Sequence, residues 1–457
     1  MVDRVRIFSR TRAAKHVGVA LAVGFALRLA WGLWAMRDVP QGWLLQGDQY
    51  SYWYFGNEMA NGRGYLSYIN GAASSYYPVG YPAMLAVLYW LDLHLRLPGS
   101  QATLTALLHT AFSTASIVLV YYIARKVFDH SVGVIAAWVT ALFPSLIAGV
   151  GTYSVETAFV FSALVCVAIV VDHDWSAGAM SRKRLLWFGV ALGWSVLIRP
   201  FSIAIVLGLA VAALLASRSW RVALRHVGWA LITFAVVLTP WTIRNELRFH
   251  RFIPISNNLG DTLCMSRFPG SNGGFAWASH PFCADQNLAE AERNPANTKA
   301  AIHFILDHPG EELRQIPKRF HLMMANDRSS LAESLDNGSN LTVTSSVLDV
   351  ANFVTDWYYH VSWILAVGGV GLFLRGWRTD RVRGPRRAIV GITAISLLVI
   401  PVALWGNPRF HTPLLAFIAI IAAASISWIF ERRPTDVSGG VDASGVVGTP
   451  RQPDLVS

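Results

Sequence analysis

Charged residues are scarce in this sequence, and their scarcity argues against an ordinary soluble fold. Aspartate, glutamate, lysine and arginine make up 14% of the 457 residues, whereas a soluble domain carries about 25%. Apolar residues make up 54%, and the mean hydropathy is +0.41. Apolar runs of about 20 residues recur along the chain, and that length matches the hydrocarbon core of a bilayer. The sequence therefore predicts an all-α polytopic membrane protein, with the lipid bilayer as its surroundings.

Cysteine is also rare, with three residues in the whole chain. Cys166 lies in an apolar segment, where a thiol packs as a small hydrophobic group. Cys264 and Cys283 lie in the one long hydrophilic stretch, and we expect them to form a disulfide if that stretch is outside the cytoplasm. The spacing and partners of a zinc site are lacking. No cofactor and no metal-ligating residues are identified in the sequence; a divalent metal stays open as a possibility, although it has no recognisable ligand set.

The basic excess of the chain points to membrane topology. The formal net charge is +11, but no basic cluster is interleaved with aromatic residues as in a nucleic-acid-binding surface, so nucleic acid is not an expected partner. Lysine and arginine gather instead in short segments between apolar runs, which is typical of cytoplasmic loops. We expect a multi-pass protein of the cell membrane.

The basic clusters also decide how the apolar segment 79–95 is interpreted. If it crosses the membrane, the clusters at 125–126, 182–184 and 375–387 fall outside. If it is interfacial or re-entrant, all three fall inside, as the positive-inside rule requires. We therefore expect ten spanning helices, within a range of nine to eleven, and both termini in the cytoplasm. The apolar segments are 16–36, 79–95, 103–124, 131–150, 153–171, 185–199, 200–217, 227–243, 357–374, 388–405 and 412–430.

This topology divides the chain into five regions. The hydrophilic stretch becomes a small extracytoplasmic cap of α or α+β structure, and the first outer loop carries juxtamembrane helices, one of them near 49–60. The C-terminal tail has no periodic pattern and is expected to be disordered. The regions are a basic cytoplasmic N-terminus at 1–15, a membrane half at 16–243 with its first outer loop at 38–78, the cap at 244–356, C-terminal membrane helices at 357–430 and the tail at 431–457.

Candidate chemistry concentrates in the first outer loop, which reads GDQYSYWYFGNEMANGRGY and later YYPVGYPAMLA. Asp48 lies just beyond the first apolar segment, where a carboxylate is costly unless it is paired or useful. It could instead cap the helix that follows. The tyrosines of the loop, Tyr50, Tyr76 and Tyr77 among them, suit stacking on sugar rings and equally suit an aromatic belt at the membrane interface.

Several motifs occur in an order that resembles a known superfamily. An acidic residue follows the first membrane helix, then an aromatic helix ending in N-G-x-G-Y, then P-x-G-Y-P. Residues 240–262, the stretch GNPRFHTP at 406–413 and the Ser154-Val155-Glu156 triplet add further matches. Together they resemble the GT-C superfamily of polyprenyl-phosphate-sugar-dependent glycosyltransferases. That group includes protein O-mannosyltransferases and the aminoarabinose transferase of lipid A.

The resemblance implies roles for individual residues. Asp48 would be the general base that deprotonates the acceptor, in a direct displacement with inversion. Cationic or hydroxyl groups would stabilise the departing phosphate. The expected phosphate-binding residues are Arg409, Arg244, Arg199, His411, Tyr76 and Tyr77, and the expected substrate-binding residues are Tyr50, Asn245 and Glu156. Two alternatives stay open: Arg199 could form a structural ion pair with Glu156, and Arg409 could be an interfacial arginine that reaches lipid headgroups.

The expected function is transfer of a sugar from a polyprenyl-phosphate donor to an acceptor outside the cytoplasm. The acceptor could be a lipid, an envelope glycan or a protein. The alternative is a transporter or flippase of a lipid-linked sugar. Such proteins tend to show paired repeats with broken helices, and the sequence has no evident internal symmetry.

Overall fold

The computed structural model describes residues 10–39, 45, 47–276, 283, 288–339, 341–375, 377 and 379–431. The start of the basic N-terminus and all but the first residue of the predicted tail lie outside these ranges. The helices are α1 (Arg10–Ala35), α2 (Gly47–Ala60), α3 (Gly80–Leu95), α4 (Gln101–Val127), α5 (His130–Ala141), α6 (Pro144–Ala148), α7 (Glu156–Val171), α8 (Arg182–Ile198), α9 (Ile205–Ser217), α10 (Trp220–Phe249), α11 (Leu259–Cys264), α12 (Glu290–Asp307), α13 (Pro309–Met324), α14 (Ser329–Leu335), α15 (Ser345–Leu374), α16 (Arg383–Leu404) and α17 (Leu415–Glu431). Short 3-10 turns are η1 (Trp175–Ala177), η2 (Pro200–Ala204) and η3 (Pro408–Leu414).

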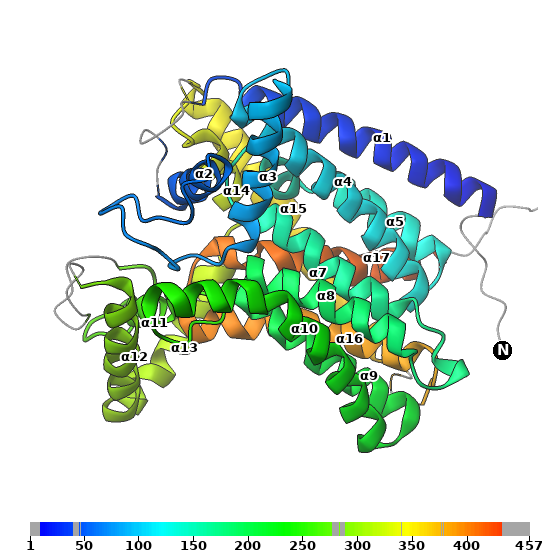
Figure 1. Ribbon diagram of the computed structural model, residues 1–457. Coiled ribbons are helices and arrows are strands. Elements are labelled where there is room, and N and C mark those ends of the chain that lie inside the picture. Colours follow the sequence, from blue (N-terminus) through cyan, green and yellow to red (C-terminus); the bar gives the residue numbers. More distant parts are fainter. Residues whose placement is uncertain are drawn as a thin grey trace, which may run out of the picture.

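The prediction of an all-helical polytopic membrane protein is confirmed. Within the described residues the only β pairing is an isolated bridge between Leu66 and Ala73. Seven helical segments there are long and apolar enough to cross a bilayer, and α5 and α7 are shorter apolar helices. The predicted count of ten spanning helices stays a prediction. Helix α3, the ambiguous segment, runs across the ends of α1 and α4 instead of alongside them (Figure 1).

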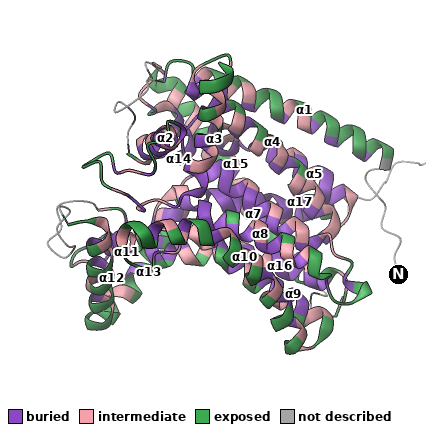
Figure 2. Cartoon of the chain, viewed as in Figure 1, coloured by how far each residue is buried: buried purple, intermediate pink, exposed green. Residues whose placement is uncertain are grey.

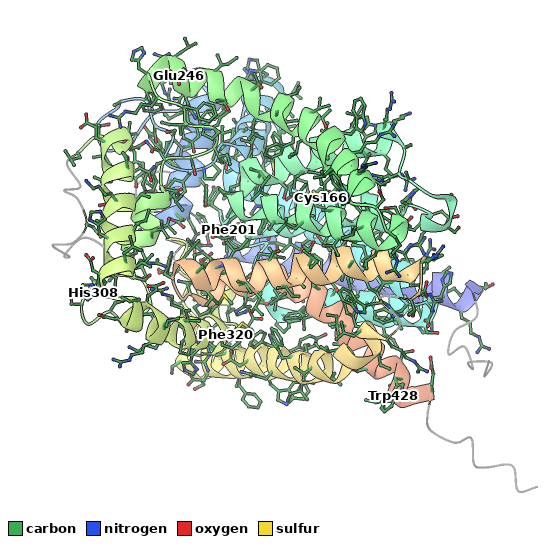
Figure 3. All side chains as sticks on the ribbon, turned by 90° about the horizontal axis from the view of Figure 1, so that it is seen from below. Cys166, Phe201, Glu246, His308, Phe320 and Trp428 are labelled. Carbon is green, nitrogen blue, oxygen red and sulfur yellow. A yellow bond between two sulfur atoms is a disulfide. The ribbon has the colours of Figure 1, made fainter. Side chains whose placement is uncertain are left out.

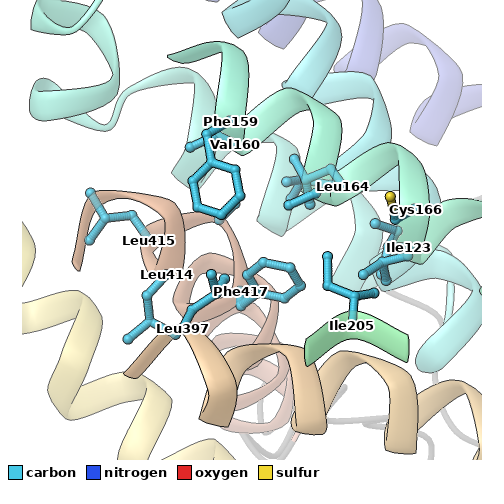
Figure 4. Close-up of a cluster of buried hydrophobic side chains, with 14 of the residues drawn as sticks. Ile123, Phe159, Val160, Leu164, Cys166, Ile205, Leu397, Leu414, Leu415 and Phe417 are labelled. Atoms are coloured by element: carbon cyan, nitrogen blue, oxygen red, sulfur yellow. The ribbon is translucent and has the colours of Figure 1, made fainter. Parts of the chain in front are cut away.

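The core lies around α7 and α17. In the most apolar stretch of the segment Pro408–Glu431, which contains η3 and α17, 72% of residues are buried, against 28% in that of α1. Both α7 and α17 are apolar all round, so they suit a central position, whereas α1 leaves an apolar face for lipid. Figure 2 shows the buried residues gathered in the centre of the bundle, and Figure 4 shows Leu164 of α7 and Phe417 of α17 in one cluster with Ile123 of α4 and Ile205 of α9.

The three basic clusters of the sequence meet at one end of the bundle. Lys126 and Arg184 both pair with Asp172, at 3.2 Å and 3.1 Å. Arg386 donates hydrogen bonds to the backbone carbonyls of Val171 and His173. Lysine and arginine near helix C-termini also interact favourably with the helix dipole. The clusters therefore share one side, which is the arrangement that the topology argument requires.

Six further helices gather at the opposite end. Helices α2, α3 and α11 to α14 all lie at the left of Figure 1, away from the N-terminus. Figure 3 shows the same polarity from below, with His308 and Phe320 at one end and Trp428 at the other. The first loop and the 259–335 region thus cover the same end of the bundle.

Candidate functional site

Four charged residues stand where helices begin or are interrupted, and these positions lie at the covered end of the bundle. Asp48 lies in the first turn of α2, and Glu156 is the first residue of α7. Arg199 is extended, with φ of −142°, because Pro200 disfavours helix at the residue before it. Arg409 lies in η3, where the Asn407 side chain accepts from its backbone N–H at 2.8 Å and Pro408 occupies the first position of the turn.

A glycine of the P-x-G-Y-P motif holds α3 against the end of α8. A Cβ on Gly80 would lie 2.7 Å from the carbonyl oxygen of Leu197, closer than real Cβ atoms approach any neighbour. Only glycine therefore permits this contact between the two backbones. The contact brings the start of α3 next to the turn that carries Arg199.

Arg409 joins three carboxylates that come from distant parts of the chain. Its guanidinium nitrogens lie 2.6 Å from Asp48, 3.3 Å from Glu156 and 3.4 Å from Glu333. Arg199 forms a further ion pair with Glu156. We call Asp48, Glu156, Arg199, Glu333 and Arg409 the ionic cluster. Two arginines among three carboxylates leave a small excess of negative charge.

Asp48 is held in its ionised form. The Tyr77 hydroxyl donates to Asp48 Oδ1 at 2.5 Å, and Arg409 donates to Oδ2 at 2.6 Å. Burial alone would raise the pKa of Asp48, but the charge of Arg409 and these two hydrogen bonds outweigh it and lower the pKa. Asp48 is therefore a weak proton acceptor while Arg409 stays paired with it.

Glu333 is a cluster member that sequence reasoning missed. The Ser154 hydroxyl donates to its carboxylate, and Gln49 donates to its backbone carbonyl at 3.0 Å. Burial raises the pKa of Glu333 to about 6; Arg409 opposes the rise, and the like charge of Glu156 adds to it. Glu333 comes from a short helix in the mixed hydrophilic stretch, where no motif marked it. The one related signal in the sequence was the Ser154-Val155-Glu156 triplet, whose serine contacts Glu333 in the structure.

The open side of the cluster is formed by Asp48 and Glu333. Their side chains keep 27% and 25% of their surface exposed, whereas Glu156 keeps 7%. A substrate can therefore reach the first two carboxylates directly. Glu156 is the most buried of the three carboxylates and contacts Arg409 at 3.3 Å.

Arg244 and Asn245 lie apart from the ionic cluster. Arg244 donates to the backbone carbonyls of Ser74 and Tyr65, at 2.6 Å and 2.8 Å, and so fastens the first loop to α10. Asn245 is fully buried and donates to the carbonyl of Ile253. Their contacts are those of residues that hold a loop, and the structure does not bring them to Asp48.

His411 also points away from the cluster, although Arg409 is two residues earlier. Its ring nitrogens lie 2.6 Å from the carbonyl of Met323 and 2.8 Å from Asp327. The ring stacks on Tyr359 with a centroid separation of 4.7 Å. His411 thus anchors η3 to α13 and α15, and neither of its nitrogens is left to bind phosphate.

The three predicted tyrosines have three different surroundings. Tyr77 belongs to the site through its hydrogen bond to Asp48. Tyr76 lies beside it but packs under Arg293, whose guanidinium carbon is 5.6 Å from the ring centroid. Tyr50 faces other aromatic rings of the first loop, among them Tyr68 at 5.0 Å. Only Tyr77 is therefore in contact with the ionic cluster.

Cys264 and Cys283 are joined in a disulfide, and Cys166 is a buried free thiol. Among the described residues no group of three or more histidine, cysteine or acidic side chains is arranged to hold a metal ion. The three carboxylates of the ionic cluster surround a guanidinium instead.

Comparison with known proteins identifies this arrangement of helices. The family model of dolichyl-phosphate-mannose-protein mannosyltransferases matches residues 82–243. The apo oligosaccharyltransferase of Archaeoglobus fulgidus aligns with a TM-score of 0.54 and 15% identity, over 93% of this chain and 51% of that one. ArnT of Cupriavidus metallidurans, bound to undecaprenyl phosphate, aligns with a TM-score of 0.51 and 14% identity, over 93% of this chain and 62% of that one. The chain has the fold of the GT-C superfamily.

The family match covers only part of the chain, and this limits which residues it can explain. No curated protein sequence matches the chain, and the chain spans about half the length of the oligosaccharyltransferase chain that it resembles. The family match begins after Asp48 and ends before Glu333 and Arg409. Three of the five residues of the ionic cluster therefore lie outside the matched segment, and the role of the cluster in this chain has to be argued from its own geometry.

Proposed function

We propose that this protein is a glycosyltransferase that moves a sugar from a polyprenyl-phosphate carrier to an acceptor hydroxyl. The observation that carries the proposal is the contact between Asp48 and Arg409 at the covered end of a GT-C bundle. A carboxylate that can take a proton and a guanidinium that can bind phosphate are the two groups that the reaction needs. Both come from motifs on which the superfamily resemblance rests.

Arg409 has to change partners for the reaction to proceed. A bound lipid phosphate competes with the carboxylates for the guanidinium, because arginine binds phosphate through paired hydrogen bonds. Once Arg409 turns to the phosphate, Asp48 loses the positive charge that lowers its pKa and becomes a better base. Donor binding therefore activates the base in this mechanism.

The transfer itself is a single displacement. The acceptor oxygen bonds to the anomeric carbon while the bond from that carbon to the phosphate oxygen breaks. The acceptor proton goes to Asp48, and the lipid phosphate leaves with the bonding electrons, stabilised by Arg409. One carboxylate on the attacking side implies inversion at the anomeric carbon. Tyr77 fixes the Asp48 side chain through its 2.5 Å hydrogen bond.

We also propose that the site faces the exterior of the cell membrane. The three basic clusters meet at the other end of the bundle, and short basic loops favour the cytoplasm. The disulfide between Cys264 and Cys283 lies in the hydrophilic region between α10 and α15, and disulfides persist in oxidising compartments. The acceptor would then be an extracytoplasmic lipid, envelope glycan or protein.

A donor panel tests the activity. Purified protein in lipid nanodiscs is given radiolabelled polyprenyl-phosphate sugars, one at a time, with mixed envelope acceptors. We expect one sugar class to be consumed with release of polyprenyl phosphate, and its product to have the inverted anomeric configuration. Movement of intact donor between leaflets without release of lipid phosphate would instead identify a flippase and refute the proposal.

A labelling experiment tests the sidedness separately. A single cysteine placed at the exposed position Asn70 of the first loop should react with a membrane-impermeant maleimide in intact cells. Reaction only after permeabilisation would place this loop in the cytoplasm and overturn the assignment.

A further inference from the structure

A small cavity lies next to the ionic cluster, because Glu156 forms part of its wall. Its walls come from α4, α6, α7, α14 and η3, and they are unusually rich in hydroxyl groups. A water molecule's centre has about 20 Å³ in which to move there. The hydroxyl-bearing lining residues are Ser113, Ser116, Ser145, Thr157, Ser330 and Thr412.

Glu156 divides its two carboxylate oxygens between the cluster and this cavity. Oε1 contacts both Arg199 and Arg409. Oε2 is buried and has no hydrogen-bond partner among the described residues, and the same is true of the Thr412 hydroxyl. A buried carboxylate oxygen or hydroxyl without a hydrogen-bond partner is destabilising, because it has lost its hydration and gained nothing in return. Two such atoms beside one polar cavity indicate a bound group that is shared between them.

The hydrogen bonds of the lining hydroxyls show which hydrogen bonds the bound group has to make. Ser113 donates to the carbonyl of Leu146, Ser145 to Asp327, and Thr157 to the carbonyl of Gly149. Because their protons are committed, these hydroxyls present lone pairs to the cavity, as Glu156 Oε2 does. The occupant must therefore donate hydrogen bonds as well as accept one from Thr412.

The volume of the cavity fits a single water molecule. A cavity holds a water when about 10–15 Å³ is open to its centre, and the water needs two to four polar partners. The 20 Å³ of this cavity meets that requirement but is too small for a phosphate or a sugar. A cation is disfavoured because Arg199 and Arg409 already supply positive charge to the same carboxylate.

We propose that this cavity binds one water molecule, which donates to Glu156 Oε2, accepts from the Thr412 hydroxyl and thereby positions Arg409. Thr412 and Arg409 lie in the same turn η3, while Glu156 begins α7. The water thus bridges the turn that carries Arg409 to the helix whose carboxylate holds it. The positioning role rests on the proposed function, whereas the water site itself does not.

Radiolytic hydroxyl labelling with mass spectrometry detects the water directly, because radicals formed from a bound water oxidise the buried side chains next to it. Leu146 and Val160 line the cavity and are 8% and 4% exposed. We expect the wild-type protein to oxidise them at least severalfold faster than Leu164 and Val167, which are fully buried in the apolar core. Equal protection of all four residues would overturn the proposal.

Two variants test whether the water acts through Thr412. Thr412→Val keeps the shape and removes the hydroxyl, so labelling of Leu146 should fall to the level of Leu164. The KM for the donor should rise about tenfold, since Arg409 binds the phosphate of the donor. Thr412→Ser should restore both values. If Thr412→Val does not fold, Ser116→Val fills the cavity from another wall and should have the same two effects.

The outcomes separate the two parts of the proposal. Unchanged labelling in the folded variants would overturn the water bridge, and lost labelling with an unchanged KM would overturn the positioning role. Labelling or activity that collapses when sodium is replaced by choline would show a bound cation and refute the water. If the wild-type protein transfers no sugar, the proposed function fails while labelling still decides the water site.

Discussion

Two buried ionic groups of this chain combine the same residue types in opposite proportions. In the ionic cluster, Arg409 stands among three carboxylates. In the group formed by Arg267, Glu312 and Arg319, which we call the clamp, two guanidiniums share one carboxylate, at 2.8 Å and 2.6 Å. The clamp lies in the region that covers the membrane bundle, at the junction of α13 with the end of α16.

The contacts of the clamp stabilise the fold. Arg267 also donates to the backbone carbonyls of Ala403 and Leu404, at 2.6 Å and 3.1 Å, which are carbonyls that the end of α16 leaves without helical partners. Burial would raise the pKa of Glu312, but its hydrogen bonds and charge contacts with the two arginines lower it. The single carboxylate thus stays ionised and fixed between its partners.

The ionic cluster has more carboxylates than its arginines can hold tightly. Arg409 is close to Asp48 but 3.3–3.4 Å from the other two carboxylates, and the pKa of Glu333 is raised to about 6. A guanidinium with several loosely held partners can be transferred to a ligand at little cost, whereas the clamp loses its only carboxylate if one residue changes. This difference predicts that mutations in the two groups have different consequences.

The largest effect is expected for Asp48→Asn. Removing the base should lower kcat about 1000-fold, within the range of general base catalysis, while the isosteric side chain preserves the fold. The measurement is the rate of polyprenyl phosphate release at saturating donor. Asp38→Asn, an exposed aspartate that pairs with Arg37, is the matched control and should behave as wild type. Full activity in Asp48→Asn would refute the assignment of the base.

The next effect is on stability and belongs to the clamp. Glu312→Gln leaves two buried arginines without their carboxylate, so the free energy of unfolding should fall by about 3 kcal/mol. Thermal unfolding in nanodiscs measures it, with Glu311→Gln on the same helical turn as the control. The turnover number of the folded Glu312→Gln protein should stay near that of wild type. A loss of turnover without a loss of stability would erase the distinction between the two groups.

A smaller effect is expected for Arg409→Lys. An ammonium keeps the charge but cannot form the paired hydrogen bonds of guanidinium, so kcat/KM for the donor should fall about 30-fold. Arg244→Lys is the informative comparison, because Arg244 fastens the first loop instead of reaching the ionic cluster. If Arg244→Lys lowers kcat/KM for the donor as much as Arg409→Lys, phosphate binding extends beyond the cluster.

The smallest effect is a dependence of stability on pH that originates from Glu333. Its folded pKa of about 6 lies above the ordinary value of 4.5, so the folded state binds this proton more tightly than the unfolded chain. The resulting stabilisation is complete below the ordinary value and is lost as the pH rises through about 6, with a magnitude of up to about 2 kcal/mol. Unfolding between about pH 4 and 7 should show this loss in wild type but not in Glu333→Gln. A slope that persists in the variant would assign it to another group.

The spanning helices and the first loop were accessible to sequence reasoning because their signals are local. Apolar length and the residue before Pro200 fixed where α8 ends, and the expected helix near 49–60 is α2. Asp48 stood out as a carboxylate at the edge of an apolar segment. The pairing of Arg199 with Glu156 was one of two open alternatives, and the structure shows that pair.

The contacts of the remaining charges were not accessible, because they depend on packing between distant elements. Arg244 and His411 stand in matched motifs, yet their partners are loop carbonyls and a buried aspartate. Glu333 carries no motif, yet it reaches Arg409 because Gln49 and Ser154 hold it there. A motif indicates which residue types a site uses, but it does not say which way each side chain points.

The sequence by itself determined that the chain is a membrane bundle, and it marked Asp48 as the candidate base, since hydropathy and helix ends are properties of neighbouring residues. Only the tertiary structure decided which charges meet. The ion pairs and the cavity beside Glu156 are formed by residues up to hundreds of positions apart in the sequence. The distances between these residues depend on how α7, α14 and η3 pack together.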